Sequence, residues 1–349
     1  MNIRRQILSV AVGLSLSGVA SAVEWTDGLN NIELNNFENI YRTTDACAAV
    51  AGSCLAVDTV NDPDGYQVVA PVGDDLADFP DGNLQVGDIF VGIMQVREIA
   101  DAGTAAVWNK DGGTDEFSGY FVQEVTSITF DETGTTDHVQ LGVASDDPFD
   151  VLDVTAGEMF AFWVDQGGDT FLNAGTTGST IDAATDGDFW GAFGLSAALA
   201  LSGSDADVDP ALTDGYLYSH IDLGNDLSNF GDQEGFTALN LVTMGTAYNA
   251  GFLAGINDFD ENEQSGPAFS PVTGTCTPLS PAPVTCNQIV GNFELSSNDN
   301  YSGFGGTSPW VFASNDPLKI YTVPEPASLA IFGMGLMGIA GLRRRKTKA

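Results

Sequence analysis

The stretch Glu158–Val164 reads Glu-Met-Phe-Ala-Phe-Trp-Val and is apolar on both faces of an extended chain. A run of this length, rich in aromatic residues, predicts a strand at the centre of a sheet and buried on both sides. Runs of similar length with apolar and β-branched residues lie on either side of it along the chain: Asp88–Ile99, Gly119–Phe130, His138–Ala144, Tyr216–Leu223 and Phe236–Thr243. Together they predict a chain built mainly from β-strands.

Turn signals separate these runs. The dipeptide Asp-Gly favours hairpin turns between strands and occurs at 27–28, 64–65, 81–82, 111–112, 186–187 and 214–215. Helical patterning is weak, and the segment Gly191–Leu201 suits either a short helix or a strand edge. Successive strands with few helices favour an all-β fold, an antiparallel β-sandwich or a jelly-roll-like ectodomain, over a parallel sheet.

The composition is that of a folded protein with a strongly acidic surface. Of the 349 residues, 43% are hydrophobic and 10% aromatic, which is enough to build a core, and we expect Trp108, Trp163, Trp190 and Trp310 to lie in it. The chain has 48 acidic and 11 basic residues, and seven of the basic ones lie in the two terminal segments. Because binding to a phosphate backbone needs clustered Lys and Arg, nucleic acid is excluded as a partner, and cations are favoured.

The region between the terminal segments divides by composition. Residues 23–256 form an acidic, β-rich ectodomain. Residues 257–322 form an acidic and Pro-rich linker followed by a C-terminal β segment. Within that segment Ile289–Tyr321 contains strand-like pieces at Val290–Leu295 and Trp310–Ala313, which either complete the main sheet or form a stalk.

Residues 1–22 have the pattern of a secretory signal peptide. Arg4 and Arg5 precede an apolar run, Ile7–Val19, and Ala20 and Ala22 flank Ser21 in a small-residue cleavage site. This order predicts export across the inner membrane and cleavage by signal peptidase after Ala22.

The C-terminal segment, residues 323–348, has a second ordered pattern. It runs from Val323-Pro324-Glu325-Pro326 through the apolar stretch Ala327–Leu342 to a basic cluster of Arg343, Arg344, Arg345 and Lys346. A helix of 16 residues spans roughly 24 Å, less than the roughly 30 Å of a bilayer core, so a short transmembrane helix here suits a transient anchor. The basic cluster is expected to stay on the cytoplasmic side and leave the body outside. Gly333, Gly335 and Gly338 match a dinucleotide fingerprint, but they lack its strand–helix context, and we interpret the match as chance.

This C-terminal pattern resembles the PEP-CTERM sorting signal of Gram-negative bacteria, which the membrane enzyme exosortase processes. The resemblance implies cleavage near Pro324, Glu325 and Pro326, which would be recognition residues. It further implies a transient stay in the inner membrane, followed by release or transfer to the cell surface or to the extracellular matrix of a biofilm or floc. The resemblance does not extend to residues 23–322.

Four cysteines form two close pairs, Cys47 with Cys54 and Cys276 with Cys286. Export into an oxidising compartment favours disulfides, and of the three possible pairings the local one is the simplest. A metal site is the alternative, but the spacing and the two histidines of the chain argue against it.

Two acidic stretches have the spacing of calcium ligands. Asp205, Asp207 and Asp209 form one, and Asp258, Asp260 and Asn262 form the other. Alternate oxygen ligands can bind Ca²⁺, the one cofactor for which the sequence offers candidates, yet both stretches lack the glycine and glutamate of an EF-hand. With so many aspartates, such spacings also arise by chance.

Two kinds of carbohydrate chemistry have candidate residues. Tyr216, Tyr218 and His220 would line one face of a strand and could stack on a polysaccharide, or pack against another part of the protein. Glu98, Glu124 and Glu158 lie on predicted strands and are the best candidates for a pair of catalytic carboxylates. No catalytic motif accompanies them. We therefore expect a non-catalytic, adhesive or structural protein of the cell surface or matrix, with a secreted polysaccharide-active hydrolase or lyase as the alternative.

Overall fold

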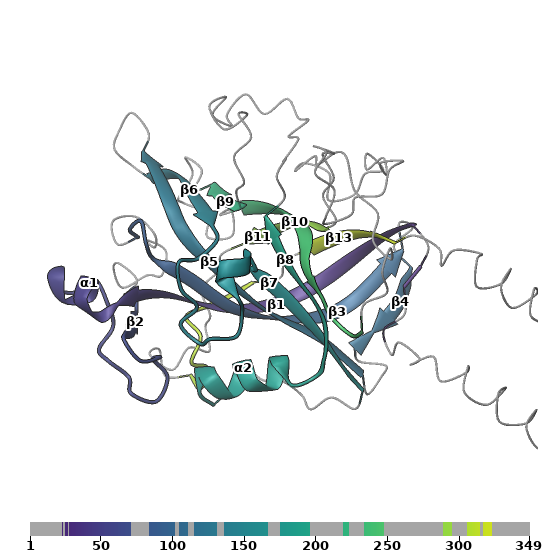
Figure 1. Ribbon diagram of the computed structural model, residues 1–349, viewed down its shortest axis with the longest axis horizontal. Coiled ribbons are helices and arrows are strands. Elements are labelled where there is room, and N and C mark those ends of the chain that lie inside the picture. The colour runs from purple at the N-terminus through teal and green to yellow at the C-terminus, as the bar shows by residue number, and fades with distance from the viewer. Residues whose placement is uncertain are drawn as a thin grey trace, which may run out of the picture.

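All the described strands belong to one antiparallel sheet, as the computed structural model in Figure 1 shows. The structure describes residues 23, 25–26, 28–70, 84–101, 105–110, 115–130, 136–166, 175–195, 219–222, 234–247, 289–294, 306–314 and 317–322. The strands are β1 (Gly28–Thr43), β2 (Tyr66–Val68), β3 (Ile89–Asp101), β4 (Ala106–Asn109), β5 (Asp115–Phe130), β6 (Thr136–Gly142), β7 (Phe160–Gln166), β8 (Asp188–Leu195), β9 (Ser219–Asp222), β10 (Glu234–Met244), β11 (Ile289–Glu294), β12 (Phe312–Ser314) and β13 (Pro317–Thr322). The expectation of a β-rich chain is confirmed.

The sheet closes into a ring. Hydrogen-bonded neighbours follow the order β3-β1-β13-β11-β10-β8-β7-β5, and β5 pairs again with β3. β6 and β9 form a second connection between β5 and β10. The predicted sandwich or jelly roll is not confirmed, because the described pairing runs continuously around the ring.

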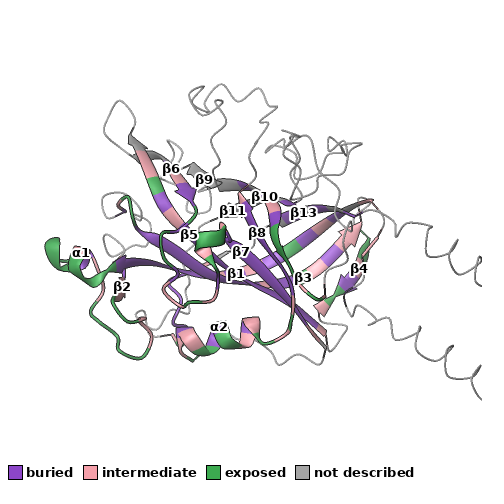
Figure 2. Cartoon of the chain, in the orientation of Figure 1, coloured by how far each residue is buried: buried purple, intermediate pink, exposed green. Residues whose placement is uncertain are grey.

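The strands β3 and β5 are buried on both faces, which explains their apolar sequences. Phe90 and Met94 face the inside of the ring, whereas Val91 and Ile93 alternate with them and are also buried. Figure 2 shows that buried residues predominate along both strands. Side chains on alternate sides of a strand can all be buried only when both faces are covered. The predicted core tryptophans Trp108, Trp163, Trp190 and Trp310 are all buried.

A second layer covers part of the outer face of the sheet. The helix α2 (Thr177–Thr185) packs on β3 and β5, and the segment before β12 lies against β1, where Asn39 donates to the carbonyl of Pro309 and accepts from the N–H of Val311. The indole of Trp310 donates to Oγ1 of Thr180 at 3.0 Å, and Oγ of Ser118 on β5 donates to the carbonyl of Ala184 at 2.7 Å. Trp310 is completely buried, so it joins the C-terminal segment to α2 and the sheet.

The C-terminal segment completes the main sheet. β13 lies between β1 and β11, and β11 pairs with β10. The strand-like pieces expected within Ile289–Tyr321 therefore complete the main sheet and do not form a stalk.

One expected helix is wrong, and two elements of the structure were not expected. The helix considered for Gly191–Leu201 is wrong over residues 191–195, which belong to the strand β8. The longest early strand, β1, was not predicted at all, and neither was α2, which begins with a capping box at Thr176 and Ser179.

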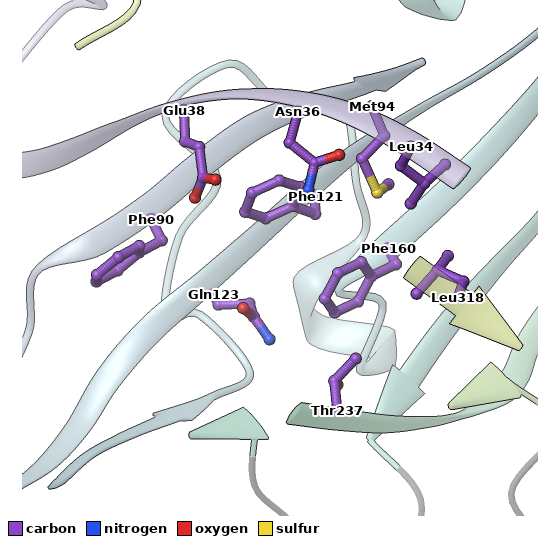
Figure 3. Close-up of a pocket in the computed structure, with 10 residues that line it drawn as sticks. All are labelled: Leu34, Asn36, Glu38, Phe90, Met94, Phe121, Gln123, Phe160, Thr237 and Leu318. Carbon is purple, nitrogen blue, oxygen red and sulfur yellow. The ribbon is translucent and has the colours of Figure 1, made fainter. Parts of the chain in front are cut away.

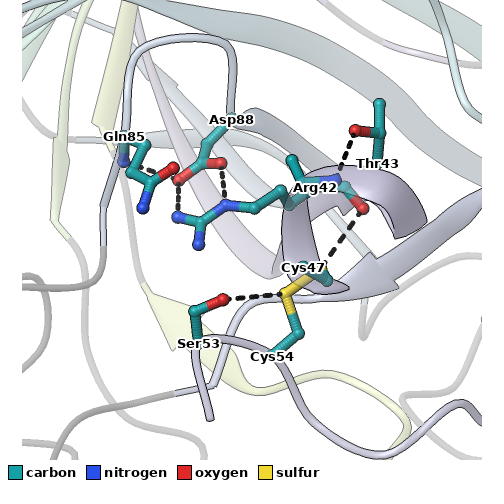
Figure 4. A network of polar contacts seen from close by, with 8 residues as sticks. Arg42, Thr43, Cys47, Ser53, Cys54, Gln85 and Asp88 are labelled. Carbon is teal, nitrogen blue, oxygen red and sulfur yellow. Dashed lines mark hydrogen bonds and ion pairs between the residues drawn. A yellow bond between two sulfur atoms is a disulfide. The ribbon is translucent and has the colours of Figure 1, made fainter. Parts of the chain in front are cut away.

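A buried ion pair and a disulfide stabilise the structure around the C-terminal end of β1 (Figure 4). Arg42 Nε lies 2.7 Å from Oδ1 of Asp88, and Arg42 Nη2 lies 2.7 Å from Oδ2. The helix α1 (Thr44–Ala49) follows, and its Cys47 forms the predicted disulfide with Cys54. Cys276 and Cys286 lie outside the described residues.

Neither described helix has the length or apolar character to cross a membrane. The signal peptide expected at 1–22 and the apolar stretch Ala327–Leu342 lie outside the described residues.

Candidate functional site

A cavity of about 30 Å³ lies inside the ring (Figure 3). It is lined by inward-facing side chains from six strands: Leu34, Asn36, Glu38, Phe90, Met94, Phe121, Gln123, Phe160, Thr237 and Leu318. Phe121 and Phe160 stack at a centroid distance of 5.6 Å and form an apolar wall. The glycine at position 92 is required here, because a Cβ atom would come within 2.4 Å of the Phe121 ring.

Four polar side chains converge on this cavity. Glu38 and Asn36 point in from β1, and Gln123 and Thr237 point in from β5 and β10 (Figure 3). All four are at most 5% exposed. Within the described part of the chain, Nε2 of Gln123 and Oγ1 of Thr237 have no hydrogen-bond partner. Each unsatisfied buried group costs about 1–3 kcal/mol, so both atoms favour a bound polar group.

The size of the cavity decides what that group is. One buried water needs about 10–15 Å³, so a cavity of about 30 Å³ holds about two waters and no sugar ring. Water can accept from the amide of Gln123 and also donate to the carboxylate of Glu38. We therefore interpret the cavity as a hydrated, structural site.

Replacement of Thr237 by valine tests the hydration of the cavity. If water bridges Oγ1 to its neighbours, Thr237→Val is expected to lower the free energy of unfolding by about 1 kcal/mol, because the water loses a partner. In a dry cavity the same change removes an unsatisfied group and raises that free energy. Urea denaturation distinguishes the two signs, and Thr59→Val, at an exposed position, serves as a comparison.

A second polar cluster lies on the outer face of β5. The hydroxyl of Tyr120 donates to Oδ1 of Asp147 at 2.5 Å. The same carboxylate accepts from the backbone N–H groups of Phe149, Val151 and Leu152 at 2.8–3.0 Å. Asp147 therefore fixes the loop after β6 against the sheet.

Burial affects the tyrosines of this region. It raises the pKa of Tyr120 well above its ordinary value of 10, and the charge of Asp147 adds to the rise. Burial and then the hydrogen bond to Asp146 raise the pKa of Tyr66 to about 12. In the unfolded chain both have the ordinary value, so deprotonation favours unfolding.

Stability is consequently expected to fall in alkaline solution. The contribution of these tyrosines is fully present below about pH 10 and is lost as the pH rises above it, with a slope of up to about 1.4 kcal/mol per pH unit for each group. Tyr120→Phe should lower stability at pH 7 by about 1–3 kcal/mol and make the alkaline loss shallower. The measurement is the free energy of unfolding of the wild-type protein and of Tyr120→Phe at a series of pH values from 7 upward. Equal slopes of this free energy against pH would contradict the prediction.

A third cluster joins the two ends of the described chain. Nδ2 of Asn30 donates to Oγ1 of Thr322 at 3.1 Å and to the carbonyl of Thr26 at 2.9 Å. The hydroxyl of Thr322 donates to the carbonyl of Thr26, and Gly28 is the strand partner of Thr322. Asn30 and Thr322 are 0% and 2% exposed. We call Thr26, Gly28, Asn30 and Thr322 the terminal clamp.

The three candidate glutamates each fix local structure. Glu98 accepts from the side-chain amide of Asn109 at 3.3 Å on β4, and Glu124 accepts from the N–H of Ser145 at 2.6 Å. Glu158 lies two residues before β7, accepts from the N–H of Asp153 at 3.0 Å and is hydrogen-bonded to Thr243 Oγ1. Each carboxylate thus holds a different loop or strand.

Most other predicted site residues lie outside the described residues. These are Ala20, Ala22, Asp205, Asp207, Asp209, Tyr216, Tyr218, Asp258, Asp260, Asn262, Pro324, Glu325, Pro326, Arg343, Arg344, Arg345 and Lys346. The backbone of His220 belongs to β9, where it pairs with Gln140 and Phe236, but its side chain is not described. Within the described ranges there is no group of three or more His, Cys, Asp or Glu residues that could hold a metal ion.

Sequence reasoning missed both the cavity and the terminal clamp, because it missed β1. Ile32, Leu34 and Ile40 are apolar residues on one face of an extended chain, and this spacing by two is the signal that could have found the strand. Asn36 and Glu38 lie on the same face. Two polar residues interrupt the apolar face, and these are the ones that line the cavity.

Comparison with known proteins supports the reading of the C-terminal segment. Residues 322–346 match the family model of the PEP-CTERM protein-sorting motif. The resemblance found in the sequence is therefore confirmed for this segment, which indicates an exported protein processed by exosortase. Comparison with curated proteins gave no match for the chain. Comparison with solved structures gave none either.

Proposed function

We propose that this chain is an exported protein that the stretch Ala327–Leu342 anchors briefly in the inner membrane until exosortase cuts it near Pro324-Glu325-Pro326. The body then reaches the cell surface or extracellular matrix, where its role is adhesive or structural. The observation that carries the proposal is the match of residues 322–346 to the sorting motif. The motif begins at Thr322, the last residue of β13, so the folded ring leads directly into it.

A non-catalytic role is supported by the candidate glutamates. The hydrogen bonds of Glu98, Glu124 and Glu158 account for each of them as a residue that fixes a loop or strand. The acidic body favours contacts with matrix polysaccharide that are bridged by cations over direct contacts with anionic polymers. Signal peptidase and exosortase would be its processing partners.

The processing step is tested in cells that make exosortase. Replacement of Pro324, Glu325 and Pro326 by alanine is expected to leave a full-length, membrane-bound precursor, as is deletion of the exosortase gene. Thr347→Ala, just outside the matched segment, is the control and should be processed normally. Processing of the triple variant at the normal rate would refute the proposal.

The role of the body is tested on the purified protein. A Ca²⁺- or polysaccharide-linked rise in melting temperature without turnover supports the adhesive role. Release of reducing sugar that is lost on Glu124→Gln or Glu158→Gln would instead establish the hydrolase or lyase.

A further inference from the structure

The described chain ends meet at one end of the closed ring, which we call the terminal end. Gly28 pairs with Thr322 there, and antiparallel register places Asp101, Asp115 and Asp188 at the corresponding ends of β3, β5 and β8. In Figure 1, β4 marks the terminal end and α1 marks the opposite end. β1 has 16 residues, so the two ends lie about 50 Å apart along the strand.

The terminal clamp fixes how far the body can lie from the membrane. Thr322 is 2% exposed and hydrogen-bonded to the chain start through Asn30 and Thr26. Only four residues separate Thr322 from Ala327, the first residue of the apolar stretch. The five steps from one Cα to the next span at most about 18 Å, and the two steps to Pro324 span at most about 7 Å.

The N-terminal side of the body leads to the same end. Val23, the first residue after the expected signal-peptide cut, is 2% exposed, and Trp25 stacks on Trp190 at 6.1 Å. Both segments that contact the membrane during export therefore connect to the terminal end. The ring can close while the C-terminal anchor is still in place.

Charge at the terminal end opposes binding to an anionic membrane. Asp188 is exposed, and Asp101, Asp115 and Asp165 are half-buried. The positive charge of Lys110 is offset by the carboxylate of Glu116, 3.2 Å away. Repulsion between these carboxylates and anionic lipids is screened by salt, with a Debye length of about 8 Å at physiological ionic strength. The tether must therefore hold this end at the surface.

We propose that the body presents its terminal end to the membrane surface, an inference that rests on the proposed membrane anchoring. The short tether of residues 323–326 holds this end there, and electrostatic attraction to the lipids does not. Exosortase then acts within about 7 Å of a folded sheet, on a chain end fixed by Thr322. Once the tether is cut, electrostatic repulsion moves the body away from the membrane. Cleavage alone is then sufficient for release.

The orientation is measured on the uncut precursor in lipid vesicles that contain no exosortase. A fluorescent amino acid replaces Asp188 at the terminal end or, as the matched variant, Asp45 on α1; both residues are exposed and acidic. Energy transfer to acceptor-labelled phosphatidylcholine head groups is expected to be several-fold greater from position 188. A flexible Gly-Ser insert of about 20 residues after Thr322 adds about 25 Å of reach and should remove most of the difference.

The possible results separate the orientation from the anchoring. Equal transfer from both positions, or greater transfer from position 45, overturns the orientation. A precursor that does not float with the vesicles contradicts the proposed anchoring itself. With phosphatidylglycerol added at low salt, transfer from position 188 should fall and then recover in high salt; a rise on adding the anionic lipid would overturn the role of repulsion.

Discussion

A chain that ends at Asp316 is expected to lose its cooperative fold, because it lacks β13. This strand contributes six residue pairs to β1 and three to β11, and it closes the ring between them. Without it, the facing edges of β1 and β11 lose their hydrogen-bond partners and become sites for aggregation. Thermal or urea denaturation followed by circular dichroism should show no native baseline.

The size of the effect follows from what β13 buries. Leu318 and Ile320 are 5% and 1% exposed, and burial of each contributes about 1.5–3 kcal/mol. Loss of Thr322 also removes a partner from Asn30, which is fully buried. Together with the lost strand pairing, these terms approach the 5–15 kcal/mol by which a typical domain is stable.

The matched control is a chain that ends at Thr322. It lacks the whole segment 323–349 but keeps β13 and the terminal clamp, and it should unfold cooperatively. If both truncated chains fold equally well, β13 is not an integral strand of the body. If neither folds, residues after 322 contribute to the fold.

The sequence was sufficient to find the strands whose residues favour extended structure. β5, β7 and β10 combine aromatic and β-branched residues over strand length, and they were predicted within a few residues. β1 was missed because it contains Asn30, Asn31, Asn35, Asn36 and Asn39, a residue type that is depleted in strands. Its pairing with β3 over nearly its full length outweighs that local preference. Closure of the ring was also beyond prediction, since it depends on contacts between residues some 290 positions apart, such as Asn30 and Thr322.

Among the functional features, too, those contiguous in the sequence could be predicted and those assembled from distant strands could not. The sorting motif is contiguous, and its order of prolines, apolar stretch and basic cluster can be read directly. The cavity brings together Glu38, Gln123 and Thr237 from three distant strands, so no local pattern reveals it. The same holds for the ion pair between Arg42 and Asp88.

Replacement of Asp88 by alanine is expected to lower the free energy of unfolding by about 3–5 kcal/mol, because it leaves the Arg42 charge buried. Arg42 and Asp88 are 2% and 1% exposed, and the carboxylate also accepts from the N–H of Gln85 at 2.7 Å. Burial raises the pKa of Asp88, although Arg42 and Gln85 oppose that rise. The cost of desolvating the two charged groups is therefore large compared with their mutual attraction, and the intact pair adds little net stability. Either charged group left buried without the other is strongly destabilising.

This asymmetry makes the double variant the decisive measurement. Arg42→Met alone and Asp88→Leu alone should each be nearly as destabilising as Asp88→Ala. Arg42→Met combined with Asp88→Leu should recover most of the loss, since no unpaired charge remains. Arg97→Met is the matched control: Arg97 is exposed, and its replacement should change stability by less than about 0.5 kcal/mol. If the double variant lost as much as the sum of the single variants, the residues would act independently. The pair would then not be the link that ties the far end of β1 to the start of β3.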